Sequence, residues 1–172
     1  MFFMNKTYPL EGSYLIATSS ISHERLRGSL VYIYQIEDNM FSGIVINKPS
    51  NKVLGDYLAY PKHVLHLPVW QGGPVGTERL IAFSRKDRDI YITDRLANLT
   101  EDQIEACMFL SGQCVWEMAA LLQQIQEGDW LLVGSNYIMP QQIPADLRID
   151  YVLRSSGVRS ERYVVGAPQE VA

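Results

Sequence analysis

The sequence predicts a single domain of mixed α and β structure, and three observations support this prediction. The chain has 172 residues, 47% hydrophobic and 20% charged, so it can bury a core without metals or disulfides. Short runs rich in Val, Ile, Leu and Tyr recur between turn residues, which is typical of strands. One later segment has apolar residues at helical spacing. Without repeats or long linkers, we expect one domain over residues 1–172, with loosely held ends at 1–10 and 164–172.

The first part of the chain predicts three strands. Leu30–Tyr34 is apolar at nearly every position, which favours a strand covered on both faces. Glu37-Asp38-Asn39 predicts a turn, and therefore an antiparallel pair. We expect the third strand to end at Asn47–Ser50, because Pro49 cannot donate a backbone hydrogen bond to a neighbouring strand. The expected strands are Ser13–Ala17, Ser29–Ile36 and Phe41–Ile46.

Shorter elements are expected in the middle of the chain. A short helix is predicted at Val53–Tyr60, followed by a strand at Leu67–Trp70. This strand runs into Gln71–Val75, a tight turn whose two glycines permit a positive φ angle or close backbone approach. A hairpin then follows, with strands at Arg79–Ser84 and Ile90–Thr93.

The last part of the chain contains the clearest helical pattern. Residues Glu117–Gln126 carry a stripe of apolar side chains, and Gly128 follows as a stop signal. Thr100–Gln103 can cap and open another helix. Cys107–Trp116 fits a helix or a strand, because Gly112 would cost about 1 kcal/mol relative to alanine inside a helix. A last strand is predicted at Trp130–Val133, and the tail carries Tyr151, Val152 and Leu153 before an arginine-containing segment.

The charge balance does not favour nucleic acid as a partner. The chain has 15 Lys and Arg against 19 Asp and Glu, a net charge of −4, so it lacks a general positive field. Four arginines lie near the end, but three acidic residues offset most of their charge. These arginines are Arg148, Arg154, Arg159 and Arg162.

Membrane and redox functions are also not indicated. No apolar stretch approaches the roughly 18 residues of a membrane-spanning helix, and residues 1–10 lack the long apolar run of a leader peptide. We therefore expect a cytoplasmic protein. Cys107 and Cys114 lack the CxxC spacing of redox or zinc motifs, so buried reduced thiols are expected.

Catalytic and metal-binding patterns are weak. His63 and His66 could bind a metal from one helical turn, but no third ligand is fixed by spacing, so a solvated loop is favoured. His23 stands beside Glu24 without a serine or cysteine in a nucleophile context. We expect no cofactor, and a binding function rather than catalysis. A histidine in a cleft beside a carboxylate would instead favour an enzyme.

Two polar turns could together form a ligand site. Asn47-Lys48-Pro49 and Gly72-Gly73-Pro74 each terminate an apolar strand. The second lacks the Gly-Lys-Ser/Thr ending of a phosphate loop, so a structural turn is the simpler interpretation. If the turns lie side by side, backbone N–H groups with two basic side chains can bind a small anion or another ligand. The candidate residues are Asn47, Lys48, Gly72, Gly73 and Arg79.

Several segments, in their order and spacing, resemble the bacterial AlgH/YqgE family. The pairing of the Asn47-Lys48-Pro49 strand end with the Gly72–Val75 turn is its most specific mark. Gly112, Trp116 and Trp130-Leu131 also stand where the family has a glycine-rich strand, a tryptophan and a later tryptophan-leucine pair. The other matching segments are Leu15–Ala17, Ser29–Tyr32 and Gly43–Ile46.

The resemblance covers about residues 12–135 and implies a fold. That fold is an α/β domain whose bent, bifurcated, largely antiparallel sheet forms a pseudo-barrel with helices packed outside. It favours a strand at Cys107–Trp116.

The family is commonly labelled a transcriptional regulator through its effect on alginate production, without an agreed biochemical activity. The resemblance therefore implies a regulatory binding module that acts through a small ligand or protein partner. The alternative is a regulator that contacts DNA directly, and exposed sheet edges could also form a homo-oligomer.

This chain departs from the family pattern at three places. His23-Glu24 replaces an aspartate-proline pair, and Gly28 replaces an arginine before the serine. Ala120-Leu121-Leu122 replaces a glutamine-leucine-glutamate helix start. A retained scaffold with an altered surface site is consistent with these departures.

Overall fold

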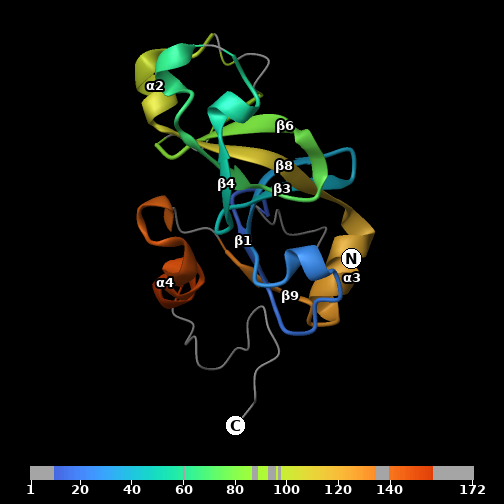
Figure 1. Ribbon diagram of the computed structural model, residues 1–172. Helices are drawn as coiled ribbons and strands as arrows, with labels where there is room; N and C mark the ends of the chain where they lie inside the picture. Colours follow the sequence, from blue (N-terminus) through green and yellow to red (C-terminus); the bar gives the residue numbers. More distant parts are fainter. Residues whose placement is uncertain are drawn as a thin grey trace.

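A curled sheet forms the centre of the structure, a computed structural model that describes residues 10–59, 61–86, 89–92, 96, 98–134 and 140–156. Within these residues the sheet has nine strands and is almost entirely antiparallel. It bends into a half-barrel, and the helices lie outside it (Figure 1). This arrangement confirms the mixed α/β class and the bent sheet expected from the sequence.

The strands are joined in an order that differs from their order along the chain. In chain order they are β1 (Tyr14–Ala17), β2 (Leu30–Glu37), β3 (Met40–Val45), β4 (Pro49–Val53), β5 (Pro68–Gln71), β6 (Val75–Ser84), β7 (Ile90–Ile92), β8 (Cys107–Glu117) and β9 (Trp130–Val133). The path across the sheet runs β4-β5-β8-β3-β2-β1-β9, and β6 pairs with both β8 and β7. Strand β8 thus has three partner strands, which makes the sheet bifurcated.

Both faces of the β1–β2–β3 region are buried. Along β1, successive side chains alternate between two apolar clusters, as the period of a strand requires. Helix α4 (Arg148–Ser155) covers one face with Val152 and Leu153. Helix α3 (Met118–Gln126) covers the other face with Leu121, and the two helices lie on opposite sides in Figure 1. The prediction of a second strand covered on both faces is therefore confirmed.

A third apolar cluster lies among β5, β6, β8 and helix α2 (Glu101–Glu105), which contributes Ile104. The helix begins where the sequence predicts. The Gln103 N–H donates to Thr100 Oγ1 over 3.2 Å, and the Thr100 N–H donates to Gln103 Oε1 over 2.8 Å. This reciprocal pair satisfies two of the free N–H groups at the helix start. None of the helices in the described ranges is long and apolar enough to cross a membrane.

Strand β8 changes partners at Gly112. The residues before it pair with β5 and β6, whereas those from Cys114 onward pair with β3. Gly112 has a φ angle of 78°, which side-chain-bearing residues rarely adopt. A Cβ atom at Gly112 would also overlap the carbonyl oxygen of Gly73. The strand implied at Cys107–Trp116 is confirmed, and its glycine lies at the bend.

Three elements differ from the expectations. Strand β3 ends before Asn47–Ser50, as expected, but this segment leads into a strand that was not predicted, β4. Proline is tolerated there because Pro49 is the first residue of an edge strand. The helix expected at Val53–Tyr60 is a single 3-10 turn, η2 (Leu54–Asp56), and Tyr60 lies outside the described residues. Helix α4 is the third difference, since no helix was predicted in the tail.

The two cysteines are buried free thiols, as predicted. Burial raises the pKa of Cys107 to about 11 and that of Cys114 to about 12. Both therefore stay protonated near neutral pH, and a protonated thiol is a poor nucleophile.

Replacing Gly112 by alanine is expected to lower the free energy of unfolding by more than about 2 kcal/mol, because the change adds a strained φ angle and an overlap with Gly73. Gly128→Ala is the matched control, since Gly128 has a φ of 88° but a Cβ atom there meets nothing within 4 Å. The control should cost about 1 kcal/mol. Urea unfolding followed by tryptophan fluorescence measures both losses. Equal losses would contradict a role for the close approach.

Candidate functional site

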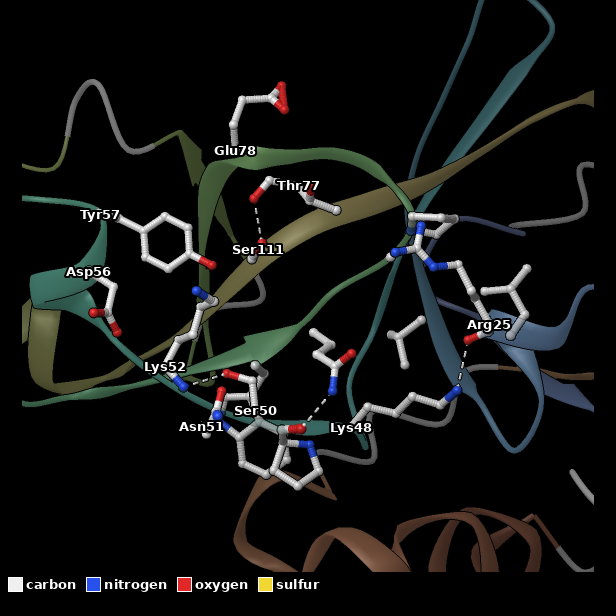
Figure 2. A pocket seen from close by; sticks show the side chains of 17 residues that line it. Arg25, Lys48, Ser50, Asn51, Lys52, Asp56, Tyr57, Thr77, Glu78 and Ser111 are labelled. Carbon is white, nitrogen blue, oxygen red and sulfur yellow. Dashed lines mark hydrogen bonds between the residues drawn. The ribbon is translucent and has the colours of Figure 1, made fainter.

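A cleft of about 840 Å³ opens beside the two turns identified in the sequence. Its walls come from η1 (Glu24–Leu26), from β4 and η2, and from the segment between β5 and β6 (Figure 2). We call it the Lys48 cleft. Its lining includes Arg25, Lys48, Lys52, Tyr57, Trp70 and Thr77.

Backbone hydrogen bonds hold the two turns side by side. The Gln71 N–H donates to the carbonyl oxygen of Lys48 over 2.8 Å, and Gln71 Nε2 donates to that of Pro49 over 2.9 Å. The Val45 N–H donates to the carbonyl oxygen of Gly72 over 2.8 Å. The two turns therefore lie side by side, which is the arrangement that the ligand hypothesis requires.

Only some of the five candidate residues line the Lys48 cleft. Lys48 and Gly73 do so, whereas Asn47, Gly72 and Arg79 are not part of its lining. Gly72 is buried, and a Cβ atom there would overlap the carbonyl oxygen of Gly112. Its role is therefore close backbone packing. Arg79 is an exposed residue of β6.

Asn47 joins two parts of the sheet with its side chain. Its Oδ1 accepts the N–H of Leu30 over 2.9 Å, and its Nδ2 donates to the carbonyl oxygen of Gly28 over 2.9 Å. Both amide atoms are thus used at the start of β2. The position of Asn47 at a strand end serves the fold rather than a ligand.

Lys48 brings a partly buried positive charge into the cleft. Its Nζ donates to the carbonyl oxygen of Arg25 over 2.8 Å, and burial lowers the pKa of this lysine. No carboxylate in the described residues forms an ion pair with it. Its charge is therefore partly desolvated and has no counter-ion among the described residues, so a bound anion could pair with it.

The other charges around the cleft are mixed. Arg25 and Lys52 add positive charge, whereas Asp56 and Glu78 are acidic. Figure 2 shows Arg25 near Lys48 on one side of the cleft, with Asp56 on the opposite side. One oxygen of Asp56 accepts the N–H of Val53 over 2.9 Å, so this carboxylate is engaged in the η2 turn.

Aromatic and hydroxyl groups complete the lining. Tyr57 and Trp70 supply aromatic surface, and Ser50, Thr77 and Ser111 supply polar groups. Ser111 Oγ donates to the carbonyl oxygen of Thr77 over 2.6 Å. Sequence reasoning missed these residues because they come from separate elements and no spacing links them.

The histidines lie away from this cleft. His23, His63 and His66 are all exposed, but His63 and His66 line a second cleft of about 490 Å³. There His63 Nε2 lies 3.8 Å from Glu101 Oε1, which is the histidine–carboxylate arrangement that would favour an enzyme. Cys107 also lines this cleft, but its raised pKa keeps the thiol protonated. The described residues contain no group of three or more His, Cys, Asp and Glu suited to a metal ion.

Two of the four arginines near the chain end, Arg148 and Arg154, lie among the described residues, and they do not share a basic surface. Arg148 is buried, and Arg154 Nε lies 2.8 Å from Asp150 Oδ2. Arg159 and Arg162 lie outside the described residues. The arginine pattern near the chain end thus mixes a buried side chain with an exposed, paired one.

The departures from the resembled family lie at two surfaces. His23 and Glu24 are exposed at η1, and Gly28 has a φ of 75°, which suits glycine. Ala120 is exposed on α3, and Leu122 lines an open groove beside the β2–β3 turn. The η1 departures adjoin Arg25, so they border the Lys48 cleft.

Comparison with known proteins gives consistent matches. A family model described as AlgH-like matches residues 14–161. A UPF0301 protein of Pseudoalteromonas translucida is 30% identical over 148 residues, covering 74% of this chain and 80% of its own. A UPF0301 protein of Paraburkholderia phytofirmans is 25% identical over 171 residues, covering 87% and 89%.

Two solved structures share the fold. The solution structure of the AlgH protein from Pseudomonas aeruginosa aligns with a TM-score of 0.71 and 19% identity, covering 98% of both chains. The crystal structure of the DIP2367 protein from Corynebacterium diphtheriae aligns with a TM-score of 0.64 and 17% identity, covering 89% of this chain and 91% of that one.

Replacing Asn47 by alanine is expected to lower the free energy of unfolding by about 1–3 kcal/mol, because it leaves the Leu30 N–H and the Gly28 carbonyl without their partner. Asn51→Ala is the control, since Asn51 is exposed on β4 and should change stability by less than about 0.5 kcal/mol. Chemical denaturation of both variants checks this. Unchanged stability in Asn47→Ala would contradict the structural role.

Proposed function

We propose that this chain, which belongs to the AlgH-like family, is a binding module that holds a small anionic ligand in the Lys48 cleft. The family identity confirms the resemblance seen in the sequence, but the family's molecular activity is unresolved. The observation that carries the proposal is the half-buried side chain of Lys48 in the cleft, whose ammonium group has no carboxylate partner among the described residues.

The charge of the cleft supports an anion. Lys48 and Arg25 lie together on one side, and Asp56, an acidic group on the opposite side, already accepts a backbone N–H. An anion beside Lys48 would gain a charge-assisted hydrogen bond, which contributes about twice as much as a neutral one. Glu78 is exposed on the far wall and would disfavour a ligand with negative charge at both ends.

The size and lining support a small molecule. A volume of about 840 Å³ lies within the range of typical small-molecule sites. Tyr57 and Trp70 can contact the flat or apolar part of a ligand, while Ser50 and Thr77 can orient its polar groups. A metabolite with one phosphate or carboxylate group and a polar body suits this lining.

In this proposal the protein acts in the cytoplasm, and regulation depends on occupancy of the cleft. The conformation of the β3–β4 connection would differ between the ligand-bound and ligand-free forms, and a protein partner could bind one of these forms selectively. Direct contact with DNA is the alternative, and the net charge of −4 speaks against it.

Replacing Lys48 by methionine is expected to weaken anion binding strongly while leaving the fold intact. The probes are inorganic phosphate, adenosine monophosphate and glucose 6-phosphate, each with a single phosphate group, tested by thermal shift and then by calorimetry. For any probe that binds the parent, affinity in Lys48→Met should fall by about tenfold or more, and Lys48→Arg should restore much of it.

Lys62→Met is the matched control, because Lys62 is an exposed lysine on η3 (Lys62–Val64) outside the Lys48 cleft. It should bind as the parent does. Equal binding by the parent and Lys48→Met, or no binding of any probe, would refute the proposal. Fluorescence anisotropy with a random DNA duplex at low and physiological salt tests the alternative, since salt-sensitive binding would favour a direct regulator.

A further inference from the structure

The second cleft, of about 490 Å³, contains a buried charge that neither the fold nor the proposed function accounts for. We call it the Arg148 cleft. It lies between α2, η3 and the start of α4, and Trp70 separates it from the Lys48 cleft because this side chain lines both. Arg148 is only 4% exposed, yet it lines this cleft.

Carbonyl oxygens hold Arg148 in place without neutralising it. Its Nε donates to Ile143 over 2.8 Å, its Nη2 donates to Gln141 over 3.0 Å, and its Nη1 donates to the carbonyl oxygen of Ile46. The guanidinium carbon also lies 4.4 Å from the centroid of the Trp70 ring. These contacts use three of the five N–H groups of an arginine.

No carboxylate in the described chain pairs with Arg148. A buried cation is expensive unless an anion or several dipoles compensate it. A second guanidinium raises the cost of burying the Arg148 charge, because Arg85 lines the same cleft. Arg85 itself donates to the carbonyl oxygens of Glu105 and Ala106. Burial, and secondly the charge of Arg85, lower the pKa of Arg148.

Gln141 is a second buried polar side chain in this cleft. It is 8% exposed, it lines the Arg148 cleft, and neither amide atom has a hydrogen-bond partner among the described residues. Such buried amides are rare because each unsatisfied atom costs about 1–3 kcal/mol. The amide atoms are closed to solvent, so a ligand reaches them only if the side chain rotates toward the cleft.

The remaining charged groups face the cleft from its outer side. Glu101 and Glu105 are exposed on α2, and Glu101 lies beside His63. The inner walls are apolar and include Val64, Met108 and Phe109. The cleft therefore has two cations, apolar walls and an acidic outer edge.

We propose that the Arg148 cleft is a second binding site, which takes a small carboxylic acid with an apolar body. The carboxylate accepts the two remaining N–H groups of Arg148 and lies within reach of Arg85, while the apolar body packs on Met108, whose side chain lies on the same face of the sheet as Trp70. A carboxylate suits this site because it matches the planar fork of an arginine. This site is independent of anion binding in the Lys48 cleft.

The test uses benzoate and hexanoate as probes, with benzamide and hexanamide as neutral counterparts of the same shape. Amide chemical shifts of the labelled protein are followed by NMR during titration. Benzoate should bind with a dissociation constant on the order of 1 mM, as expected for a fragment of this size, and benzamide about tenfold more weakly. The largest shifts should fall around Arg85 and Phe109.

Arg85→Gln is expected to weaken benzoate several-fold and leave benzamide unchanged, because Arg85 is exposed and its hydrogen bonds to described residues go to backbone carbonyls. Arg148→Met should remove the preference for benzoate over benzamide. Leu67→Trp, which enlarges a half-buried side chain of the lining, should weaken both probes. If Arg148→Met does not fold, Arg85→Gln and Leu67→Trp still decide the question.

Lys48→Met should bind benzoate as the parent does, which separates this site from the Lys48 cleft. Equal affinity for benzoate and benzamide, or loss of benzoate binding in Lys48→Met, would overturn the proposal. The absence of shifts with either acid at 20-fold the expected constant, about 20 mM, would also overturn it.

Discussion

The close approach of the β5–β6 turn to β8 is the contact on which both the sheet and the Lys48 cleft depend. Gly72 and Gly73 meet Gly112 backbone to backbone, and a Cβ atom at any of the three would overlap the other segment. The Gly72 N–H also donates to the carbonyl oxygen of Ser111 over 2.8 Å, and its own carbonyl accepts the N–H of Val45. One residue thus links β8 to β3, and the turn it belongs to holds Lys48 in place.

Local patterns predicted most of the sheet, whereas elements stabilised by distant contacts were missed. The strand at Leu30–Tyr34 could be predicted from its local sequence alone, because a strand covered on both faces is apolar at nearly every position. Strand β4 has no such signal, since its sequence Pro-Ser-Asn-Lys-Val is mostly exposed and is held by pairing with β5. Helix α4 does carry Ile149, Val152 and Leu153 at helical spacing, but this short stripe was not interpreted as a helix.

Polar residues were harder to interpret than apolar ones. The sequence correctly placed Lys48 beside the glycine turn, because strand ends collect polar groups at one edge. It could not distinguish the cleft residue Lys48 from the structural residue Asn47, whose amide forms hydrogen bonds at the start of β2. Nor could it identify Arg148, because burial of a charged side chain is decided by residues more than a hundred positions away, such as Ile46. Charge counting treated this arginine only as one of four near the chain end, whereas the fold stacks it on Trp70.

The position of β8 has a consequence for synthesis of the chain. All three of its partner strands precede it in the sequence, and β1 gains its outer neighbour only with β9. A nascent chain can form the β2–β3 hairpin early, but β5 and β6 have no common partner until β8 has left the ribosome. Long-range strand pairing of this kind folds slowly and leaves unpaired edges exposed. During translation the edges of β3, β5 and β6 that pair with β8 therefore stay open to other chains until β8 has been made.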